Sequence, residues 1–421
     1  MTRVLLFSAT TGYQLRSYDE AAARRGVELV LATDRCHQLD DPWRDRAIAV
    51  RFHDVPASIE AIELAAKDRP FSAVMSVGDS PAILIASAAD RLGLPGNPPD
   101  AGAASVDKRE ARRRFASAGL RVPWTVSVPA DVDASAAALD PRLTFPCVLK
   151  PLGLSGSRGV IRADDPESLA AALTRIRALL ARPDVRARAE RGVSDDVLVE
   201  GFIHGHEYAV EGVLSGGSLH VFTIFDKPDP LDGPFFEETI YVTPPAMNDD
   251  LRAAIETEVE RGARALGLRY GPVHAELRAG RDGVFVLEIA ARPIGGLCSK
   301  ALRFEGGLSL EDVLLAHALG GDASAYRRER DASAVMMIPI PRRGLLKHVD
   351  GEAQARAREY VIDVRITAKP DQLIEPLPEA GSYLGFIFAS APTPAQAEAA
   401  VREAHEQLTF KIDPAIDLVA R

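Results

Sequence analysis

Residues 271–296 read GPVHAELRAGRDGVFVLEIAARPIGG, with two alternating apolar runs on either side of a Gly-Arg-Asp-Gly sequence. Alternation around a short, turn-rich centre predicts an antiparallel β-hairpin. With the turn centred on Asp282, Glu276 faces Glu288 across the two strands, and a slip of one residue would change every pair. The other expected pairs are His274 with Ala290 and Pro272 with Arg292.

The period-two alternation divides the predicted hairpin into two faces. One face carries the charged side chains and consists of His274, Glu276, Val286, Glu288, Ala290 and Arg292. The other face is apolar and is expected to pack in the core. It consists of Val273, Ala275, Leu277, Phe285, Leu287, Ile289 and Ala291.

The facing glutamates predict a metal site. Two carboxylates opposite each other on a strand pair lie about 5 Å apart and repel unless a cation separates them or one is protonated. Glutamate oxygens suit Mg²⁺ or Mn²⁺, and Mg²⁺ is often held by one or two carboxylates together with substrate phosphates. Arg292 on the same face offers a fork for a phosphate or carboxylate. The alternative is a solvated face with chance charges, which Val286 and Ala290 disfavour.

Composition limits the classes of protein. The chain has 421 residues, 47% of them hydrophobic, which is enough for two to four globular domains. A net charge of −10 argues against nucleic-acid binding. No signal peptide and no apolar run of about 20 residues is evident, so we expect a cytoplasmic protein without a membrane segment. Cys36, Cys147 and Cys298 form no CxxC or Cys/His cluster, so neither a disulfide framework nor zinc is indicated.

The first hundred residues alternate apolar runs with helical patterns, which predicts a parallel sheet with crossover helices. Ligands of such sheets gather beyond the carboxyl ends of the strands, so Ser8, Thr10, Thr11 and residues 78–80 are candidate contacts. The dinucleotide motif GxGxxG is absent. Asp79 has an alternative interpretation as the N-cap of a helix from Pro81 to Leu92.

Two lysines stand out because only eight of the 50 basic residues are lysines. Lys108 lies in the first turn of a helix predicted over about residues 106–118, where the helix dipole disfavours a cation. Lys150 ends a predicted strand and precedes PLGLSGSRGV, a loop rich in Gly and Ser whose free N–H groups suit phosphate. An ordinary hairpin turn is the alternative for this loop.

Further candidates follow along the chain. Strands over VLVEGFI and HEYAVEGVL bracket a turn with His204 and His206, which we interpret as exposed turn histidines. The glutamates beside this turn, Glu200, Glu207 and Glu211, suit sugar hydroxyls or an adenine amino group. Residues 181–196 are expected to form a polar, exposed and mobile connection. The long loop containing Phe235 and Phe236 is expected to act as a lid or to pack on the neighbouring sheet.

Four features occur in a fixed order: Lys108 on a helix, Lys150 before the small-residue loop, the Val-Glu-x-Phe-Ile strand end with a glutamate seven residues after Glu200, and the Glu/Glu/Arg hairpin. Together they resemble the ATP-grasp superfamily of carboxylate-amine ligases, over about residues 100–320. The sequence EIAARPIGG and the last module, with its SYLGFIFA strand, resemble the L-amino acid ligases that form dipeptides.

This resemblance implies an α/β protein with α+β character in its ATP-binding part. The implied domains are a parallel-sheet pre-ATP-grasp domain (1–100), a linker and A subdomain (101–195), a B subdomain with the metal hairpin (196–330) and a C-terminal α+β module (331–421). It also implies ATP with Mg²⁺ or Mn²⁺ as cofactors and amino acids, or a related carboxylate and amine, as substrates. A homodimer remains open.

The resemblance also implies residue roles. Lys108 and Lys150 would contact ATP phosphates, and the phosphate loop would include Ser155, Gly156, Ser157 and Gly159. Glu200, Phe202 and Ile203 would form the adenine hinge, and Glu207 would contact the ribose. Glu276 and Glu288 would bind the metal, while Arg292, Lys150 and His274 would serve catalysis. Many members carry Asn at the position of Ala290, so this chain lacks one expected oxygen ligand.

The implied reaction is ATP-dependent amide formation between an amino-acid carboxylate and an amine, through an acyl phosphate. Two alternatives stay open. One is an ATP-grasp ligase with another acceptor, such as bicarbonate with biotin or a nucleotide-precursor amine. The other is a catalytically silent nucleotide-binding protein.

Overall fold

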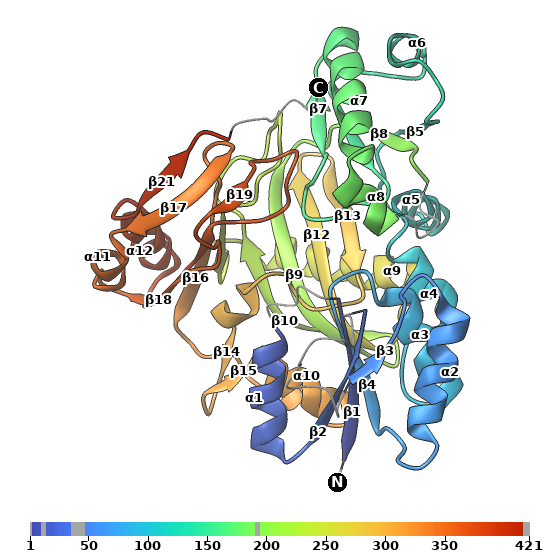
Figure 1. Cartoon of the computed structure of the whole chain (residues 1–421), viewed down its shortest axis with the longest axis vertical. Helices are drawn as coiled ribbons and strands as arrows, with labels where there is room; N and C mark the ends of the chain where they lie inside the picture. Colours follow the sequence, from blue (N-terminus) through green and yellow to red (C-terminus); the bar gives the residue numbers. More distant parts are fainter. Residues whose placement is uncertain (1, 10–13, 35–46, 190–193, 416–421) are drawn as a thin grey trace. The chain divides into compact units, whose positions relative to one another are not determined.

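The computed structural model describes residues 2–9, 14–34, 47–189 and 194–415. The chain divides into two compact units (Figure 1). Unit 1 contains Met1–Val122, Tyr208–Phe225 and Met247–Arg330, and unit 2 contains Pro123–Glu207, Asp226–Ala246 and Asp331–Arg421. The four sequence-based domains follow different boundaries and stay a prediction. No helix in the described ranges is both long and apolar enough to cross a membrane.

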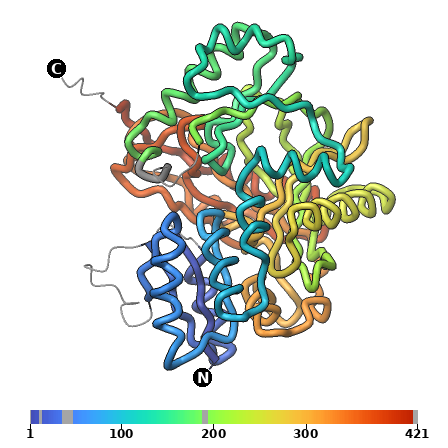
Figure 2. The backbone as a smooth tube through the Cα atoms, turned by 90° about the vertical axis from the view of Figure 1, so that its right-hand side faces the viewer, coloured from blue at the N-terminus to red at the C-terminus, as the bar shows by residue number. Residues whose placement is uncertain are grey.

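Unit 1 begins with the predicted parallel sheet, whose strand order is β3-β2-β1-β4. Leu5 and Phe7 point to a core shared with α2 and α3, which lie side by side (Figure 2). The elements are β1 (Arg3–Ser8), α1 (Leu15–Arg25), β2 (Glu28–Thr33), β3 (Ala47–Ala49), α2 (Val55–Ala66), β4 (Ala73–Val77) and α3 (Ala82–Leu92). Ser8 is buried, whereas Thr10 and Thr11 lie outside the described residues.

The rest of unit 1 is an antiparallel sheet in the order β13-β12-β9-β10, with α5 and α9 packed together beside it. Val273, Ala275 and Leu277 share its core with Val259 of α9. The elements are α4 (Pro99–Ala104), α5 (Lys108–Ser117), β9 (His206–Ser215), β10 (Ser218–Asp226), α9 (Asp249–Leu266), β12 (Gly271–Gly280), β13 (Gly283–Ala290), η2 (Cys298–Ala301), β14 (Arg303–Phe304), β15 (Leu308–Ser309), α10 (Leu310–Ala318) and η3 (Ala323–Ala325). The outer residues of β9 and β10, His206–Glu207 and Asp226, belong to unit 2.

The hairpin β12–β13 has the predicted pair Glu276–Glu288, but a β-bulge produces it. Near the turn, Gly280 pairs with Gly283 and Leu277 with Val286, which alone would place Glu276 opposite Leu287. The register shifts between Glu276 and Leu277, so one extra residue in β13 restores the glutamate pair. His274 pairs with Ala290, as predicted.

The bulge makes part of the face assignment wrong. Val284 and Val286 lie in the core with Leu277, whereas Phe285 and Leu287 are only partly buried. The extra residue reverses the alternation of β13 on the turn side of the bulge, so Val286 leaves the charged face. Beyond the bulge Ile289 lies in the core and the predicted alternation holds.

Unit 2 contains a second antiparallel sheet in the order β5-β8-β6-β7, with α7 packed on β6 and β7. Its elements are β5 (Thr125–Val128), α6 (Ala134–Ala138), β6 (Cys147–Pro151), β7 (Ile161–Ala163), α7 (Pro166–Leu180), α8 (Pro183–Ala189) and β8 (Val197–Gly201). The polar connection expected over residues 181–196 is in part a helix, because residues 183–189 form α8 and bury Val185. Residues 190–193 of this connection lie outside the described residues.

The C-terminal part of unit 2 has the expected α+β composition. Strands β11, β16, β20 and β18 are neighbours in that order, β17 lies between β19 and β21, and α12 packs on β16 and β20. The elements are β11 (Ile240–Thr243), β16 (Ala332–Ile338), β17 (Gly344–Asp350), α11 (Glu352–Arg356), β18 (Val361–Ile366), β19 (Gln372–Ile374), β20 (Gly385–Ala391), α12 (Pro394–His405) and β21 (Thr409–Asp413).

Candidate active site

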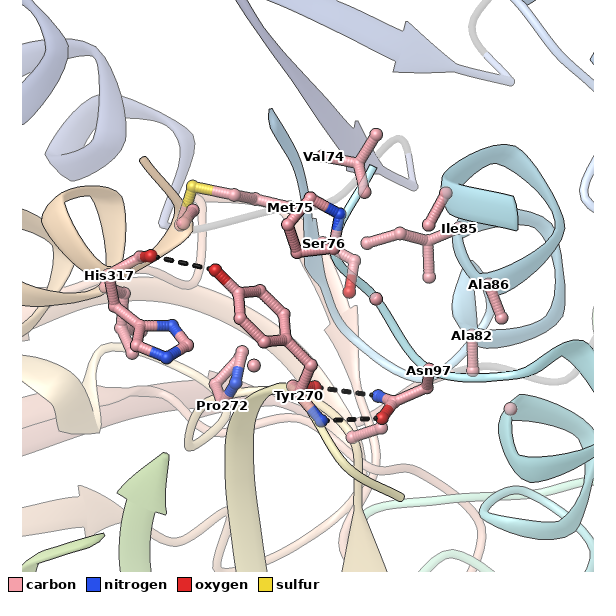
Figure 3. Close-up of a pocket in the computed structure, with 18 residues that line it drawn as sticks. Val74, Met75, Ser76, Ala82, Ile85, Ala86, Asn97, Tyr270, Pro272 and His317 are labelled. Carbon is pink, nitrogen blue, oxygen red and sulfur yellow. Dashed lines mark hydrogen bonds between the residues drawn. The ribbon is translucent and has the colours of Figure 1, made fainter. Parts of the chain in front are cut away.

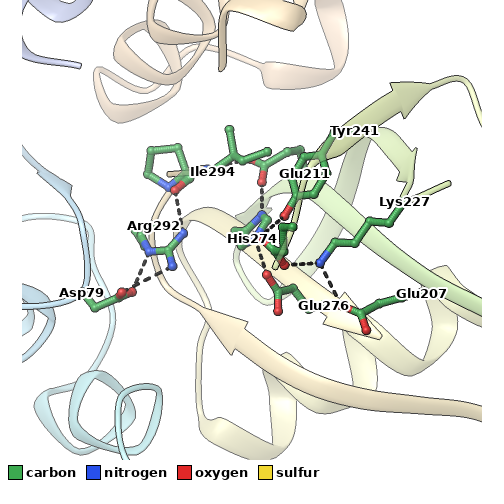
Figure 4. A network of polar contacts seen from close by, with 11 residues as sticks. Asp79, Glu207, Glu211, Lys227, Tyr241, His274, Glu276, Arg292 and Ile294 are labelled. Carbon is green, nitrogen blue, oxygen red and sulfur yellow. Dashed lines mark hydrogen bonds and ion pairs between the residues drawn. The ribbon is translucent and has the colours of Figure 1, made fainter. Parts of the chain in front are cut away.

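Arg292 of unit 1 is paired with a residue that sequence reasoning did not connect to it. Its Nε donates to Oδ1 of Asp79 at 2.5 Å and its Nη2 to Oδ2 at 3.3 Å, while Nη1 donates to the carbonyl of Pro293 at 3.1 Å. The side chains of Arg292 and Asp79 are 14% and 26% exposed. Figure 4 shows this fork closed on the Asp79 carboxylate. The guanidinium is therefore held in a fixed plane.

Asp79 is not the N-cap of the helix that follows it. Helix α3 begins at Ala82 with Pro81 at the N-cap, and no side chain caps it. Burial alone raises the pKa of the Asp79 carboxyl, but the charge and hydrogen bonds of Arg292, followed by the charges of Lys108 and His274, lower it overall. Asp79 is thus a carboxylate at neutral pH. The expected position of Lys108 in the first turn of its helix is confirmed, because α5 begins at Lys108.

His274 is fully buried beside a second carboxylate. Its Nδ1 contacts Glu211, its Nε2 lies 3.4 Å from Oε1 of Glu276, and the other Glu211 oxygen accepts from the N–H of Ile294 at 3.2 Å. Burial lowers the pKa of His274, but Glu211, and then Glu276, raise it to about 9. The His274 ring is therefore protonated on both nitrogens and positively charged at neutral pH, and it is held on two sides by Glu211 and Glu276 (Figure 4).

Glu211 thus makes its contacts with His274 and Ile294 of unit 1, and not with the turn beside which it stands in the sequence. Burial raises the pKa of its carboxyl, against the charge and hydrogen bond of His274. Sequence reasoning noted the residue but missed its partner, which lies 63 residues away.

The facing pair Glu276–Glu288 has the donor chemistry of a Mg²⁺ or Mn²⁺ site. Both side chains are partly buried, and Ala290 beside them is buried. The two negative charges raise the pKa of Arg292 further, after Asp79. Carboxylate oxygens of this kind fit one divalent cation whose remaining ligands are phosphate oxygens or water. Glu276 and Glu288 are the residues that would hold it.

In unit 2, Lys150 at the end of β6 lies against the predicted hinge. Its Nζ is 2.7 Å from Oε2 of Glu200, and the side chain of Glu200 is 2% exposed. Strands β6 and β8 pair Val148 with Glu200, which brings the two side chains to one place. The structure therefore joins two predicted nucleotide contacts, Lys150 and Glu200.

The Gly/Ser loop after Lys150 has the backbone that its composition indicates. Gly156, Ser157 and Gly159 adopt positive φ angles of 63°, 55° and 73°. A Cβ on Gly159 would lie 2.8 Å from Pro151, so only glycine fits that position. The loop connects the antiparallel strands β6 and β7, so it is the connection of a hairpin, but it spans residues 152–160 and is longer than an ordinary hairpin turn.

Phe202 of the predicted hinge lies in an aromatic cluster of unit 2. The guanidinium of Arg162 lies 4.5 Å from the Phe202 ring centre, and Phe236 stacks on Phe202 with the ring centres 6.4 Å apart. Phe235 forms an isolated bridge with Ile161. Of the two interpretations of the Phe235–Phe236 loop, packing on the neighbouring strand describes this arrangement. Ile203 follows in the chain and is half-buried, and His204 and His206 are exposed as expected.

Sequence reasoning missed Lys227. This lysine, 2% exposed, contacts Glu207 at 2.9 Å and also Glu238, and its Nζ lies 5.1 Å from the ring centre of Tyr241. Tyr241 donates to Glu238 at 2.8 Å, and Figure 4 shows Lys227 in contact with Glu207. The available signal was that one of only eight lysines begins the carboxylate-rich loop. Glu207, the predicted ribose contact, is thus neutralised by Lys227.

A separate cavity in unit 1 is too small for an amino acid. Its lining consists of apolar side chains together with Ser76, Asn97, Tyr270 and His317. The side chain of Asn97 makes two hydrogen bonds with the backbone of Tyr270 (Figure 3). The volume open to the centres of water-sized molecules is about 50 Å³. That is roughly a third of the ~150 Å³ of a cavity that admits benzene. We therefore assign no substrate to it.

Comparisons with known proteins agree with this arrangement. Three family models match in order: an ATP-grasp N-terminal domain (residues 19–96), an ATP-grasp domain (143–301) and the L-amino acid ligase C-terminal domain 2 (336–413). The uncharacterised protein y4rH of Sinorhizobium fredii is 26% identical over 99% of this chain and 85% of its own length. The alanine–anticapsin ligase of Bacillus subtilis is 26% identical over 66% of this chain, and the match spans 60% of that ligase.

A solved structure is similar over the full length. The L-amino acid ligase from Bacillus licheniformis is 27% identical, with a TM-score of 0.83 over 98% of this chain and 99% of that one. The three domain models and this likeness confirm the fold class and the resemblance drawn from the hairpin and the lysines. The chain belongs to the ATP-grasp superfamily of ATP-dependent carboxylate-amine ligases and groups there with the L-amino acid ligases.

Proposed function

We propose that the protein forms a peptide bond between the carboxylate of one amino acid and the amino group of a second, converting ATP to ADP and phosphate. The observation that carries this proposal is the full-length likeness to an L-amino acid ligase, which includes the C-terminal domain matched over residues 336–413. Glu276 and Glu288 on β12–β13 and Arg292 after β13 support it, because Arg292 and a divalent cation held by the two glutamates would offset the charge of anionic reactants.

The chemistry follows from the weak reactivity of a carboxylate. Its oxygen attacks the γ-phosphorus of ATP, the bond to the β-phosphate oxygen breaks, and an acyl phosphate and ADP result. The neutral amine then attacks the acyl carbon, the bond to the phosphate oxygen breaks, and the ammonium proton is lost as the amide forms. Each step moves negative charge, so the side chains act mainly by positioning and by electrostatics.

In this proposal the residues of unit 1 serve the reacting carboxylate. Arg292, fixed by Asp79, donates its remaining N–H groups to the transferred phosphate or to a substrate carboxylate. Protonated His274 contributes a positive charge beside Glu276 and does not act as a base, because its pKa is raised to about 9. A divalent cation held by Glu276 and Glu288 would neutralise phosphate oxygens. Lys108 adds a further cation.

The residues of unit 2 serve the nucleotide. Lys150 contacts phosphate, and the backbone N–H groups of Ser155, Gly156, Ser157 and Gly159 form the phosphate loop. Glu200, Phe202 and Ile203 contact the adenine, and Glu207 contacts the ribose. The acyl phosphate must be kept from water, and closure of the Gly/Ser loop is the proposed means.

A matrix of amino-acid pairs with Mg-ATP tests the proposal. We expect ADP and phosphate release with selected pairs, a dipeptide by mass spectrometry, and a hydroxamate when hydroxylamine replaces the amine. Glu288→Gln serves as the inactive control. The proposal fails if no pair releases ADP and no hydroxamate forms. Product formation from bicarbonate and biotin, or from a phosphorylated amine, would assign another acceptor. A Glu288→Ala variant that still binds ATP and leaves the chemistry of the wild type unchanged would indicate a silent protein.

A further inference from the structure

The connection between β19 and β20, residues 375–381, lies along the Gly/Ser loop of the same unit. The N–H of Gly159 donates to the carbonyl of Pro378 at 2.9 Å, and Nε of Arg158 donates to the carbonyl of Glu379 at 2.7 Å. A Cβ placed on Gly381 would lie 3.4 Å from the carbonyl oxygen of Gly156. Two segments that are more than 200 residues apart in sequence therefore meet along the loop.

Ion pairs brace this connection on α7 and the turn after it. Arg175 of α7 forms a two-pronged pair with Glu379, with Nε–Oε1 at 2.6 Å and Nη2–Oε2 at 2.9 Å. Arg182 binds Glu375 at 2.8 Å, and Arg343 of the C-terminal part binds the other Glu375 oxygen at 3.0 Å. The same helix α7 supplies Leu179, which packs at Gly159. Loop and connection thus share one support.

This support uses some backbone N–H groups of the loop in hydrogen bonds and leaves others without one. Gly159 uses its N–H on Pro378, whereas the N–H groups of Gly156 and Ser157 make no hydrogen bond within the part of the chain that the structure describes. Both residues have left-handed backbone angles. Successive N–H groups of this kind converge on an anion.

We propose that residues 375–381 support the phosphate loop and hold it in position, with Glu379 as a positioning residue for ATP phosphate binding. The proposal rests on the nucleotide role given above to Ser155, Gly156, Ser157 and Gly159. A Gly-rich loop loses much backbone entropy when it is ordered, so a loop ordered in advance binds its ligand more tightly. The C-terminal module is thereby part of the nucleotide site through its effect on residues 155–159.

The central test reverses the Arg175–Glu379 pair. We expect Glu379→Arg and Arg175→Glu each to weaken Mg-ATP binding about threefold to tenfold, as the loss of a partly exposed ion pair followed by repulsion predicts. Calorimetric titration without amino acids measures this, and hydrogen exchange of residues 152–160 should become faster. The double variant should restore both readouts. With an amino-acid pair in hand, KM for ATP rises while kcat at saturating ATP stays within about twofold.

Asp363→Arg is the matched control. Asp363 pairs with Arg356 in the same C-terminal part, and the exposures of 45% and 29% nearly equal the 46% and 29% of Arg175 and Glu379. This variant should bind Mg-ATP as the wild type does. If Glu379→Arg does not fold, as judged by circular dichroism, Glu379→Gln takes its place with a smaller loss.

Two results overturn the proposal. One is an ATP affinity of Glu379→Arg equal to that of Asp363→Arg. The other is a double variant that remains as weak as the single ones. Failure of the proposed function is distinguishable, because a wild-type protein that binds Mg-ATP but joins no amino-acid pair still allows the binding comparison.

Discussion

The hairpin β12–β13 and the Gly/Ser loop present anion-binding groups in two different ways. Glu276, Glu288 and His274 stand on paired strands, and Arg292 follows β13. Arg292 pairs with Asp79, which is 26% exposed, and His274 with Glu211, which is 1% exposed. The loop is held by backbone hydrogen bonds to Pro378 and Glu379 and by ion pairs that are about half exposed on the arginine side. In the proposed function the first arrangement fixes charge beside the reacting carboxylate, and the second would permit the loop to be released and reseated.

The largest effect should come from breaking the buried fork of the hairpin region. Asp79→Ala leaves the Arg292 guanidinium without its partner, and we expect a loss of about 3 kcal/mol in the free energy of unfolding. Urea denaturation measures it. Because the pKa of Asp79 lies below its ordinary value, the stabilisation is complete above about pH 4 and is lost as the pH falls through the lowered value. Asp79→Ala should therefore flatten the acid limb of the stability profile.

The control for this measurement is Glu63→Ala, which breaks the exposed pair with Arg91. It should cost less than about 1 kcal/mol. Equal losses in the two variants would contradict the view that burial sets the strength of the hairpin pair.

A chemical effect of nearly that size should follow from changing a metal ligand. Glu288→Gln keeps the shape of the side chain but removes its charge, and we expect amide formation to fall about 10²–10³-fold. A chelator should abolish activity, and added Mg²⁺ or Mn²⁺ should restore it in the wild type. Asp282→Asn in the turn of the same hairpin is the control, and a similar loss there would argue against a metal site at Glu288.

An intermediate effect is expected at the buried cluster of Lys227, Glu207 and Glu238. Lys227→Met leaves Glu207 and Glu238 facing each other without a cation, at a cost of about 2 kcal/mol. Thermal unfolding followed by circular dichroism measures it. Lys347→Met, which breaks an exposed pair with Asp371, should leave the transition nearly unchanged. A Lys227→Met protein as stable as the wild type would contradict a stabilising role for this lysine.

The smallest effect should be found at the brace of the loop. Arg175→Met breaks a two-pronged arginine–carboxylate pair as Asp79→Ala does, but the guanidinium is 46% exposed. We expect a loss below about 1 kcal/mol in the free energy of unfolding, measured in the same urea titration. A loss as large as that of Asp79→Ala would remove the distinction between fixed and releasable regions.

Local patterns predicted much of the fold and part of the site. The hairpin, the parallel sheet and the helix starting at Lys108 follow from alternation, capping and turn residues, which act over short distances in the chain. The predicted partner of Glu276 is also correct, but a bulge that the prediction did not include produces it. Lys150 and Glu200 were found separately, and the pairing of β6 with β8 brings them together. These features needed only residue type and spacing.

The contacts that sequence reasoning missed depend on long-range packing. Asp79 and Arg292 are 213 residues apart, and no local pattern distinguishes Asp79 as an N-cap from Asp79 as a partner of a distant arginine. Lys227 looked like a loop residue because the carboxylates that bury it, Glu207 and Glu238, gain that position only when β9 and β10 pair. The bulge near Leu287 left no sign in the alternation, since both faces of β13 are apolar near the turn.

That bulge has a consequence for protein engineering. On the turn side of Leu287 the hairpin follows its own register, so the two ends of β12–β13 are set independently. A tag or fluorophore attachment sequence inserted between Arg281 and Asp282 would then leave the facing of Glu276 and Glu288 intact. Deletion of the single residue Leu287 would remove the bulge, so that Glu288 follows Val286 and still faces Glu276. The loop tip is therefore a suitable attachment point for a reporter, and the extra residue is a position at which the chain can be shortened without changing the glutamate pair.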